Sequence, residues 1–133
     1  MTSLTRLRDL TISKYKISFL LPSLRGGGAQ RVMLNIASAL SERNHDIELI
    51  LVKKEGELAD RIPRSIKVVD LASTGALMSI PALFRYFRKH KPPLLFSSLP
   101  HISLLAVIVK LLACAKTNIV IVEHNTLSQS VQF

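Results

Sequence analysis

Apolar and polar residues along this chain form blocks with the spacing of alternating strands and helices. An apolar run over 17–21 is stopped by Pro22 and followed by a glycine triplet at 26–28. Beyond the glycines, apolar residues recur at the i, i+3, i+4 and i+7 spacing of a core-facing helix: Met33, Ile36, Ala37 and Leu40. The stretch 16–40 therefore predicts a strand, a glycine-rich loop and a helix, the opening unit of a nucleotide-binding α/β domain.

Further apolar runs have the length and composition of strands: 46–53, 66–71, 94–98 and 118–123. A second helix is predicted where apolar residues again recur at helical spacing, at Leu77, Ile80, Phe84 and Phe87. Because the strands are apolar nearly throughout, the order β-α-β-β-α-β-α-β indicates a parallel sheet covered on both faces. With right-handed crossovers the fold class is α/β, a Rossmann-like doubly wound parallel sheet of about five strands.

A third helix is predicted over 102–115, and it is apolar on nearly every side apart from Ser103 and Lys110. At about 1.5 Å per residue it is too short to cross a bilayer, which needs about 20 residues. We therefore expect a buried helix. Cys114, the single cysteine of the chain, is expected to be a small core residue, which suits a reducing cytoplasm.

Residues 1–15 lack the apolar segment of a signal peptide and are expected to form a short, frayed leader. Residues 16–133 are expected to form the Rossmann-like domain. No helix is predicted after the last strand, although a doubly wound sheet normally carries one there. We therefore expect a domain truncated after that strand, with part of the sheet near 119–122 left uncovered.

Composition and charge favour some classes of binding partner over others. The chain has 133 residues, 48% of them hydrophobic, which suits one domain with a sizeable core. Lys and Arg total 18 against 9 acidic residues, a formal net charge of +9. Such a charge favours phosphates or an anionic membrane surface. Nucleic acid is the less favoured partner, because only 5% of residues are aromatic and no basic–aromatic stacking motif occurs.

The glycine triplet is the first candidate site. Gly26, Gly27 and Gly28 let backbone N–H groups approach an anion, and Arg25 and Arg31 flank them as candidate diphosphate ligands. The dinucleotide fingerprint G-x-G-x-x-G fails because Arg31 stands at its third glycine position, and no P-loop motif is present. A plain flexible turn between strand and helix is the alternative.

The second candidate site lies where the last predicted strand ends, at Glu123, His124 and Asn125. Ligands of open α/β sheets bind at the carboxyl ends of the strands. A histidine there is able to donate a hydrogen bond to a sugar hydroxyl or to carry a proton. His101 follows the fourth strand and is expected on the same edge. The alternative is a polar strand terminus that only caps the next loop.

A third feature is the basic side of the second predicted helix, where Arg85, Arg88 and Lys89 stand beside its apolar stripe. A basic amphipathic helix is able to lie on anionic lipid, so these residues are candidate membrane contacts. The alternative is a solvated outer face. No His, Cys or Asp cluster has the spacing of metal ligands, so no metal is expected.

With these residues in place, the chain resembles the amino-terminal domain of family 4 glycosyltransferases, which have the GT-B fold. The resemblance covers about residues 16–126 and rests on four segments in order: GGGAQRV (26–32), RNHDIELI (43–50), KPPLLFSS (91–98) and IVIVEHN (119–125). The family more often has glutamate where Gln30 stands and aspartate where Pro93 stands.

The resemblance implies one half of a GT-B architecture, in which two Rossmann-like domains face each other across a cleft. The first domain binds mainly the acceptor and the second binds a nucleotide-sugar donor, which is a substrate; no permanently bound cofactor is implied. The glycine loop would approach the donor diphosphate when the cleft closes, and His124 would lie near the transferred sugar. The family's Glu-x7-Glu signature, which belongs to the second domain, does not occur in this sequence.

The chain is therefore expected to be the acceptor half of a retaining hexosyltransferase, inactive by itself, with a C-terminal donor-binding domain and a sugar or lipid-linked acceptor as partners. A cytoplasmic location, peripheral on the inner face of the membrane and serving cell-envelope glycan assembly, is expected from the family and the charge. The alternative is a non-catalytic α/β binding or interaction module.

Overall fold

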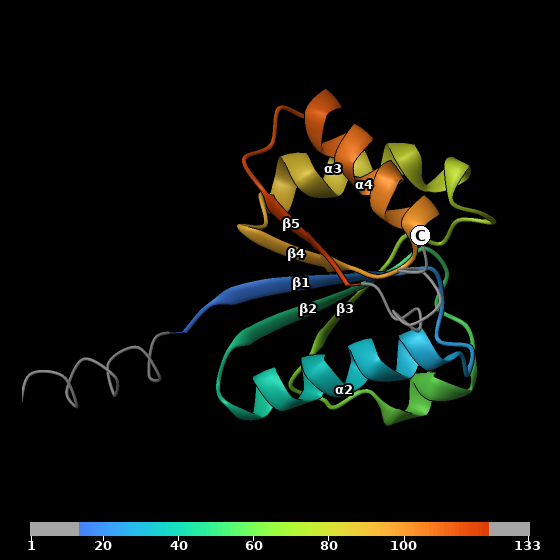
Figure 1. The fold of residues 1–133 in the computed structure, drawn as a ribbon, viewed down its shortest axis with the longest axis vertical. Helices are drawn as coiled ribbons and strands as arrows, with labels where there is room; N and C mark the ends of the chain where they lie inside the picture. Colours follow the sequence, from blue (N-terminus) through green and yellow to red (C-terminus); the bar gives the residue numbers. More distant parts are fainter. Residues whose placement is uncertain (1–13, 123–133) are drawn as a thin grey trace, which may run out of the picture.

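The computed structural model describes residues 14–122, which form a five-stranded, all-parallel sheet with helices on both faces (Figure 1). The elements in chain order are β1 (Lys16–Leu21), α2 (Gly28–Glu42), β2 (Asp46–Leu51), the 3-10 helix η1 (Glu57–Arg61), β3 (Lys67–Asp70), the 3-10 helix η2 (Leu77–Ser79), α3 (Ile80–His90), β4 (Leu94–Ser97), α4 (Pro100–Leu112) and β5 (Asn118–Ile121). The predicted order of strands and helices is confirmed.

The strand order is β3-β2-β1-β4-β5, with β1 at the centre of the sheet. Phe19 of β1 lies opposite Leu49 of β2 on one side and Phe96 of β4 on the other. The chain winds outward from β1 in one direction through β2 and β3, and then returns to build β4 and β5. The point where the order reverses, between β1 and β4, is the place where open α/β sheets bind ligands.

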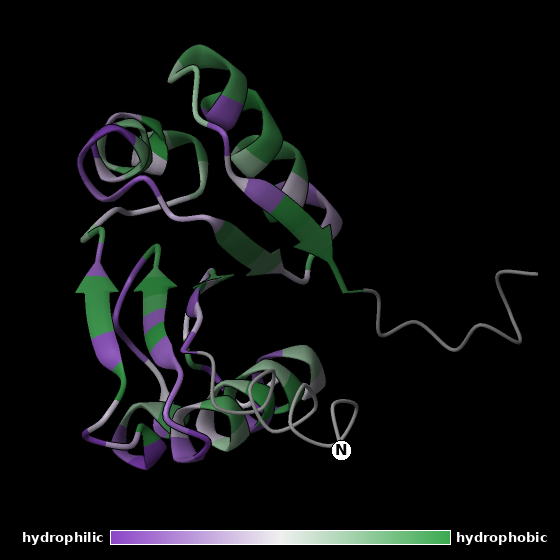
Figure 2. Ribbon diagram, turned by 90° about the vertical axis from the view of Figure 1, so that its left-hand side faces the viewer, coloured by the Kyte–Doolittle hydropathy of each residue, from purple (hydrophilic) through white to green (hydrophobic). Residues whose placement is uncertain are grey.

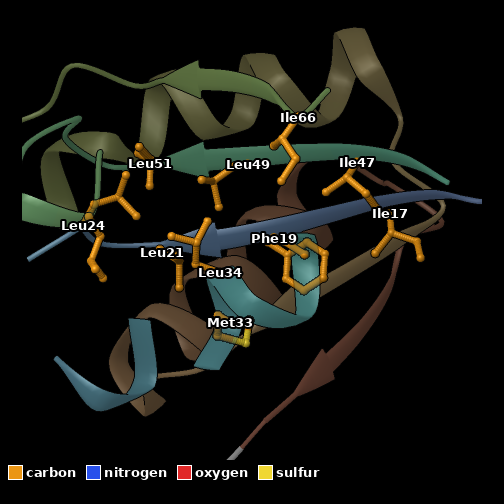
Figure 3. Close-up of a cluster of buried hydrophobic side chains, with 12 residues drawn as sticks. Ile17, Phe19, Leu21, Leu24, Met33, Leu34, Ile47, Leu49, Leu51 and Ile66 are labelled. Atoms are coloured by element: carbon orange, nitrogen blue, oxygen red, sulfur yellow. The ribbon is translucent and has the colours of Figure 1, made fainter. Parts of the chain in front are cut away.

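Alternate residues of β1 serve the two cores. Phe19 and Leu21 face α2 and join Met33 and Leu34 in the core on that face (Figure 3). Leu20 faces the opposite side and joins the core beneath α3 and α4, where Leu83 and Phe87 are among the buried residues. A strand with both faces buried reads as a continuous apolar run, which is why 17–21 shows no alternation in sequence.

Two expectations for the third predicted helix are wrong. The helix, α4, is not buried on all sides, because Leu104, Ile108, Leu111 and Leu112 are exposed to solvent. Cys114 is exposed rather than buried, since the helix ends at Leu112 and the cysteine follows with a left-handed φ of 52°. Figure 2 colours most of this helix as hydrophobic, with a few hydrophilic positions between. Sequence periodicity cannot assign a covered side to a helix without a polar side.

Burial along α2 differs in part from the predicted apolar stripe. Leu34 is buried on α2, whereas Ile36 and Leu40 of the predicted stripe are only partly buried. Val120 and Ile121 of β5 are exposed. In the described part of the chain, no helix combines the length and the apolar character required to cross a membrane.

Candidate functional site

The carboxyl ends of the strands meet at one edge of the sheet, and the loops that follow them enclose a cavity of about 240 Å³. Its polar lining includes Ser23 and Arg25 from the loop after β1, Lys53 after β2, Thr74 after β3, and His101 at the start of α4. The structure therefore brings together two of the predicted site residues, Arg25 and His101, that are far apart in sequence.

Ser98 directly follows β4 beside the reversal point of the strand order. Its side chain is buried, yet within residues 14–122 its Oγ atom has no hydrogen-bond partner. A buried hydroxyl without a partner is rare in native proteins, because it has lost its water without gaining a new bond.

The glycine loop exposes the positive end of α2. Gly27 caps the helix with extended backbone, but it offers no side-chain hydrogen bond, and the first turn carries no acidic residue. Gly26, Gly27 and Gly28 are all exposed to solvent. The first N–H groups of a helix carry partial positive charge, so this loop presents donors that suit an anion.

Arg25 is held over this edge by an acidic partner. Its Nη2 atom lies 2.5 Å from Oε1 of Glu55, and Nζ of Lys53 lies 3.2 Å from Oε2 of the same carboxylate. Hydrogen bonding from Lys53, followed by that from Arg25, lowers the pKa of Glu55 against the opposing effect of burial. Two cations share one carboxylate here, so the cluster keeps a net positive charge.

Arg31 lies on the other side of the glycine loop, next to a smaller cavity of about 130 Å³ that Asn35 and Arg61 also line. Its Nη2 atom is 3.6 Å from the position that a Cβ on Gly26 would occupy. The carboxylate of Glu57 lies closer still to that position, directly over Gly26. A diphosphate that approached the loop would have to displace this exposed carboxylate, a feature that the sequence reading missed.

Comparison with known families matches residues 26–132 to Glycosyltransferase Family 4. The chain belongs to this family. A search of curated proteins returned no similar sequence. The family match and the parallel five-stranded sheet are consistent with the amino-terminal half of a GT-B glycosyltransferase.

Gly56, in the turn after β2, lies against the backbone that leads into the glycine loop of this glycosyltransferase domain. Its φ of 122° is open to glycine alone, and a Cβ there would overlap the backbone of Leu24 and Arg25. Leu24 is also bonded across this contact, donating its N–H to the carbonyl of Glu55 at 2.8 Å. The turn after β2 thereby fixes the loop that carries Arg25.

A buried polar cluster lies under α3, towards the amino ends of the strands. Ser18, Glu48 and Lys67 stand abreast on β1, β2 and β3. The phenol of Tyr86 donates to Glu48 Oε2 and accepts from Ser18 Oγ at 2.8 Å. Lys67 Nζ and His90 Nδ1 lie 3.4 and 3.6 Å from Glu48 Oε1. This cluster joins α3 to three strands of the sheet.

The environment of Glu48 determines how the cluster titrates. Burial by itself would raise the pKa of Glu48, but the Tyr86 hydrogen bond and the nearby cationic groups outweigh it and lower the pKa. Burial lowers the pKa of His90, and burial together with Glu48 raises the pKa of Tyr86 far above its usual range. At neutral pH Glu48 is therefore a carboxylate, while His90 and Tyr86 are neutral.

The remaining predicted site residues lie apart from the carboxyl edge or outside the described chain. Arg85, Arg88 and Lys89 are exposed on α3, which covers the side of the sheet opposite to α2 (Figure 1). Glu123, His124 and Asn125 lie outside the described residues 14–122. Within that range, no group of three or more potential His, Cys, Asp or Glu ligands is arranged to hold a metal ion.

Proposed function

We propose that this chain is the acceptor-side domain of a retaining glycosyltransferase that uses a nucleotide sugar as donor. The observation that carries the proposal is the cavity at the carboxyl edge of a family 4 domain, where Arg25, His101 and the end of the glycine loop's strand come together. In the proposal a second domain holds the nucleotide, and no cofactor is bound permanently.

The residues at this edge have distinct proposed roles. Arg25 and the N–H group of Gly28 at the start of α2 stabilise the donor diphosphate, whose negative charge grows as the glycosidic bond to the sugar breaks. His101 donates a hydrogen bond to a sugar or acceptor hydroxyl from the start of α4. Arg31 adds positive charge on the far side of the loop.

We also propose that His124 lies near the transferred sugar, with Glu123 and Asn125 beside it in the sequence. Support comes from the position of β5, which pairs with β4 and runs parallel to it, so the chain that follows Ile121 leaves from the carboxyl edge of the sheet. We further propose a sugar or lipid-linked acceptor and a role in cell-envelope glycan assembly on the cytoplasmic side of the membrane; both rest on the family and on the net charge of +9.

A non-catalytic binding module is the second candidate, and one observation favours it. Glu55 pairs with Arg25, and Glu57 lies over Gly26, so both features predicted to meet a diphosphate already have acidic neighbours. A loop that never binds an anion would show this arrangement. The two candidates differ in whether pyrophosphate displaces these carboxylates.

Pyrophosphate titration of the ¹⁵N-labelled chain distinguishes the two candidates. We expect the amide resonances of Gly26, Gly27 and Gly28 to shift, and Arg25→Gln to weaken binding about fivefold, which corresponds to ~1 kcal/mol. Arg43→Gln, which removes a charge beyond the other end of α2, is the matched control and should leave the affinity unchanged. Absence of any shift in the glycine resonances would support the binding module instead.

We also expect the purified chain by itself to transfer no sugar, because the Glu-x7-Glu signature of the donor-binding domain does not occur in its sequence. Incubation with a panel of nucleotide sugars and lipid-linked acceptors should release no nucleoside diphosphate above the blank. Robust turnover by the chain alone would contradict the division of labour proposed here.

A further inference from the structure

The exposed side of α4 is apolar. Leu104, Ile108, Leu111 and Leu112 are 62%, 44%, 69% and 62% exposed, and their i, i+4, i+7 and i+8 spacing places them on one side of the helix. The opposite side of α4 is buried against the sheet and α3. A surface helix of a soluble domain normally has polar residues on its outer side, so this apolar stripe requires a partner.

The charge around the stripe has one sign. Residues 71–122 contain no Asp or Glu, whereas the acidic side chains of the described chain all lie between 42 and 70. The same stretch carries the cations of α3, α4 and their loops: Arg85, Arg88, Lys89, Lys91, Lys110 and Lys116. Within residues 14–122 none of these six forms a salt bridge. The α3–α4 layer is therefore purely cationic at its surface.

The stripe leads into a cationic cavity. About 700 Å³ lie between the carboxyl ends of α3 and α4, on the edge of the sheet opposite to the glycine loop. Arg88, Lys91 and Lys116 line this cavity above an apolar floor that includes Phe87. A hydrogen bond of 2.6 Å from Thr117 Oγ1 to the Pro92 carbonyl joins the two loops that form its wall. Three cations over an apolar floor, without salt bridges in residues 14–122, suit the phosphate of an amphiphile.

We propose that the α3–α4 layer docks on an anionic phospholipid bilayer, with the α4 stripe inserted at the interface and lipid phosphates in the cationic cavity. Exposed leucines beside lysines and arginines are the chemistry by which a helix lies in the plane of a membrane surface. The inference goes beyond the proposed function and does not depend on it. It also shifts the predicted membrane contact from Arg85, Arg88 and Lys89 to a surface centred on α4.

Charge complementarity favours a bilayer over the other occupants. A second copy packed symmetrically on this layer would place six cations against the same six cations, a repulsive arrangement. Nucleic acid would match the cations but would leave the exposed leucines without a partner, because single strands are bound by stacking on aromatic rings. An anionic bilayer matches both the charge and the apolar stripe.

The first experiment uses the single cysteine of the full chain. Cys114 is exposed and lines the cationic cavity, so a polarity-sensitive thiol probe attached there reports on this surface alone. We expect its emission to shift to the blue with vesicles of phosphatidylcholine and phosphatidylglycerol, and much less with phosphatidylcholine alone. Raising the salt concentration should weaken the response, because exposed charges are screened within ~10 Å at 0.1 M.

Vesicle co-sedimentation of unlabelled variants then tests the residues. Leu104→Gln, Ile108→Gln and Leu111→Gln together alter only exposed positions, and we expect them to reduce the bound fraction at least tenfold. Arg88→Gln, Lys91→Gln and Lys116→Gln together should remove most of the preference for anionic lipid. The matched control Arg43→Gln, Lys54→Gln and Arg64→Gln removes the same charge from other parts of the surface and should bind as the unaltered chain does.

Three results would overturn the proposal. The first is that the unaltered chain fails to sediment with anionic vesicles. The second is that the α4 variant binds as well as the unaltered chain. The third is a dimer in analytical ultracentrifugation that the α4 substitutions dissociate without any effect on vesicle binding, which would assign the stripe to a second copy. None of these measurements involves sugar transfer or pyrophosphate, so their outcome is independent of the test of the proposed function.

Discussion

Replacing Gly56 by alanine is expected to lower the free energy of unfolding by about 3 kcal/mol or more. The residue has a φ of 122°, a conformation that L-amino acids avoid, and a Cβ would overlap backbone atoms of Leu24 and Arg25 rather than a flexible side chain. The loop has to move, and the contact that carries Arg25 moves with it. Urea unfolding followed by circular dichroism measures the change, and pyrophosphate binding should weaken in parallel.

Gly28→Ala is the matched control for this substitution. Gly28 begins α2, and a Cβ added there would meet nothing within 4 Å. We expect a change within about 1 kcal/mol, because alanine is a better helix former than glycine and no contact is lost. If both variants unfolded at the same urea concentration, the result would contradict the close contact between Gly56 and the backbone of Leu24.

Tyr86→Phe is the second substitution with a large expected effect, about 1–3 kcal/mol at neutral pH. Phenylalanine keeps the ring that stacks on His90, with ring centroids 4.6 Å apart. It removes the donor to the buried carboxylate of Glu48 and the acceptor for Ser18. The loss is large for one oxygen atom because a buried carboxylate is left with fewer hydrogen bonds. Thermal unfolding of both proteins measures it.

The pH dependence of stability gives this substitution a second readout. The folded-state pKa of Glu48 is lowered, so its contribution is present above the unfolded pKa and is lost as the pH falls through the folded value. The pKa of His90 is also lowered, so the unfolded chain takes up its proton first as the pH falls below about 6.5. Both effects destabilise the fold in acid.

In Tyr86→Phe the pKa of Glu48 should rise, because the hydrogen bond that lowers it most is gone. The acid-induced loss of stability should therefore begin at a higher pH than in the unaltered protein. Tyr15→Phe is the control, because Tyr15 is half exposed and its ring lies beside His45 rather than Glu48. Parallel pH profiles for the unaltered protein and Tyr86→Phe would show that the phenol does not set the titration of Glu48.

Local sequence patterns were sufficient to predict the strands, the helices and the part of the candidate site that the glycine loop forms. The apolar run 17–21, its arrest at Pro22 and the glycines at 26–28 specify β1, the loop and the start of α2 through backbone preferences and burial, which act over a few residues. The order of elements then predicted a parallel sheet, and a parallel sheet places the loops that hold Arg25 and His101 at one edge.

The sequence could not predict which side chains from different elements would contact one another. Glu48 stands in the apolar run of β2, and only the packing of α3 over Ser18 and Lys67 shows why a carboxylate is stable there. The same limit applies to Glu57, whose contact with Gly26 joins residues of two different loops. Contacts of this kind depend on the distance between elements in space, which local periodicity does not encode.

The sequence by itself determined the class of fold and the edge at which the candidate site lies, because helix and strand periods, glycines and prolines act locally along the chain. Only the tertiary structure decided that α4 is covered on one side and bare on the other, and that Gly56 must approach the backbone of Leu24. A helix that is apolar all round has the same pattern whether one side or both are buried. The number of elements that pack against it, and not its own sequence, sets how much of it faces solvent.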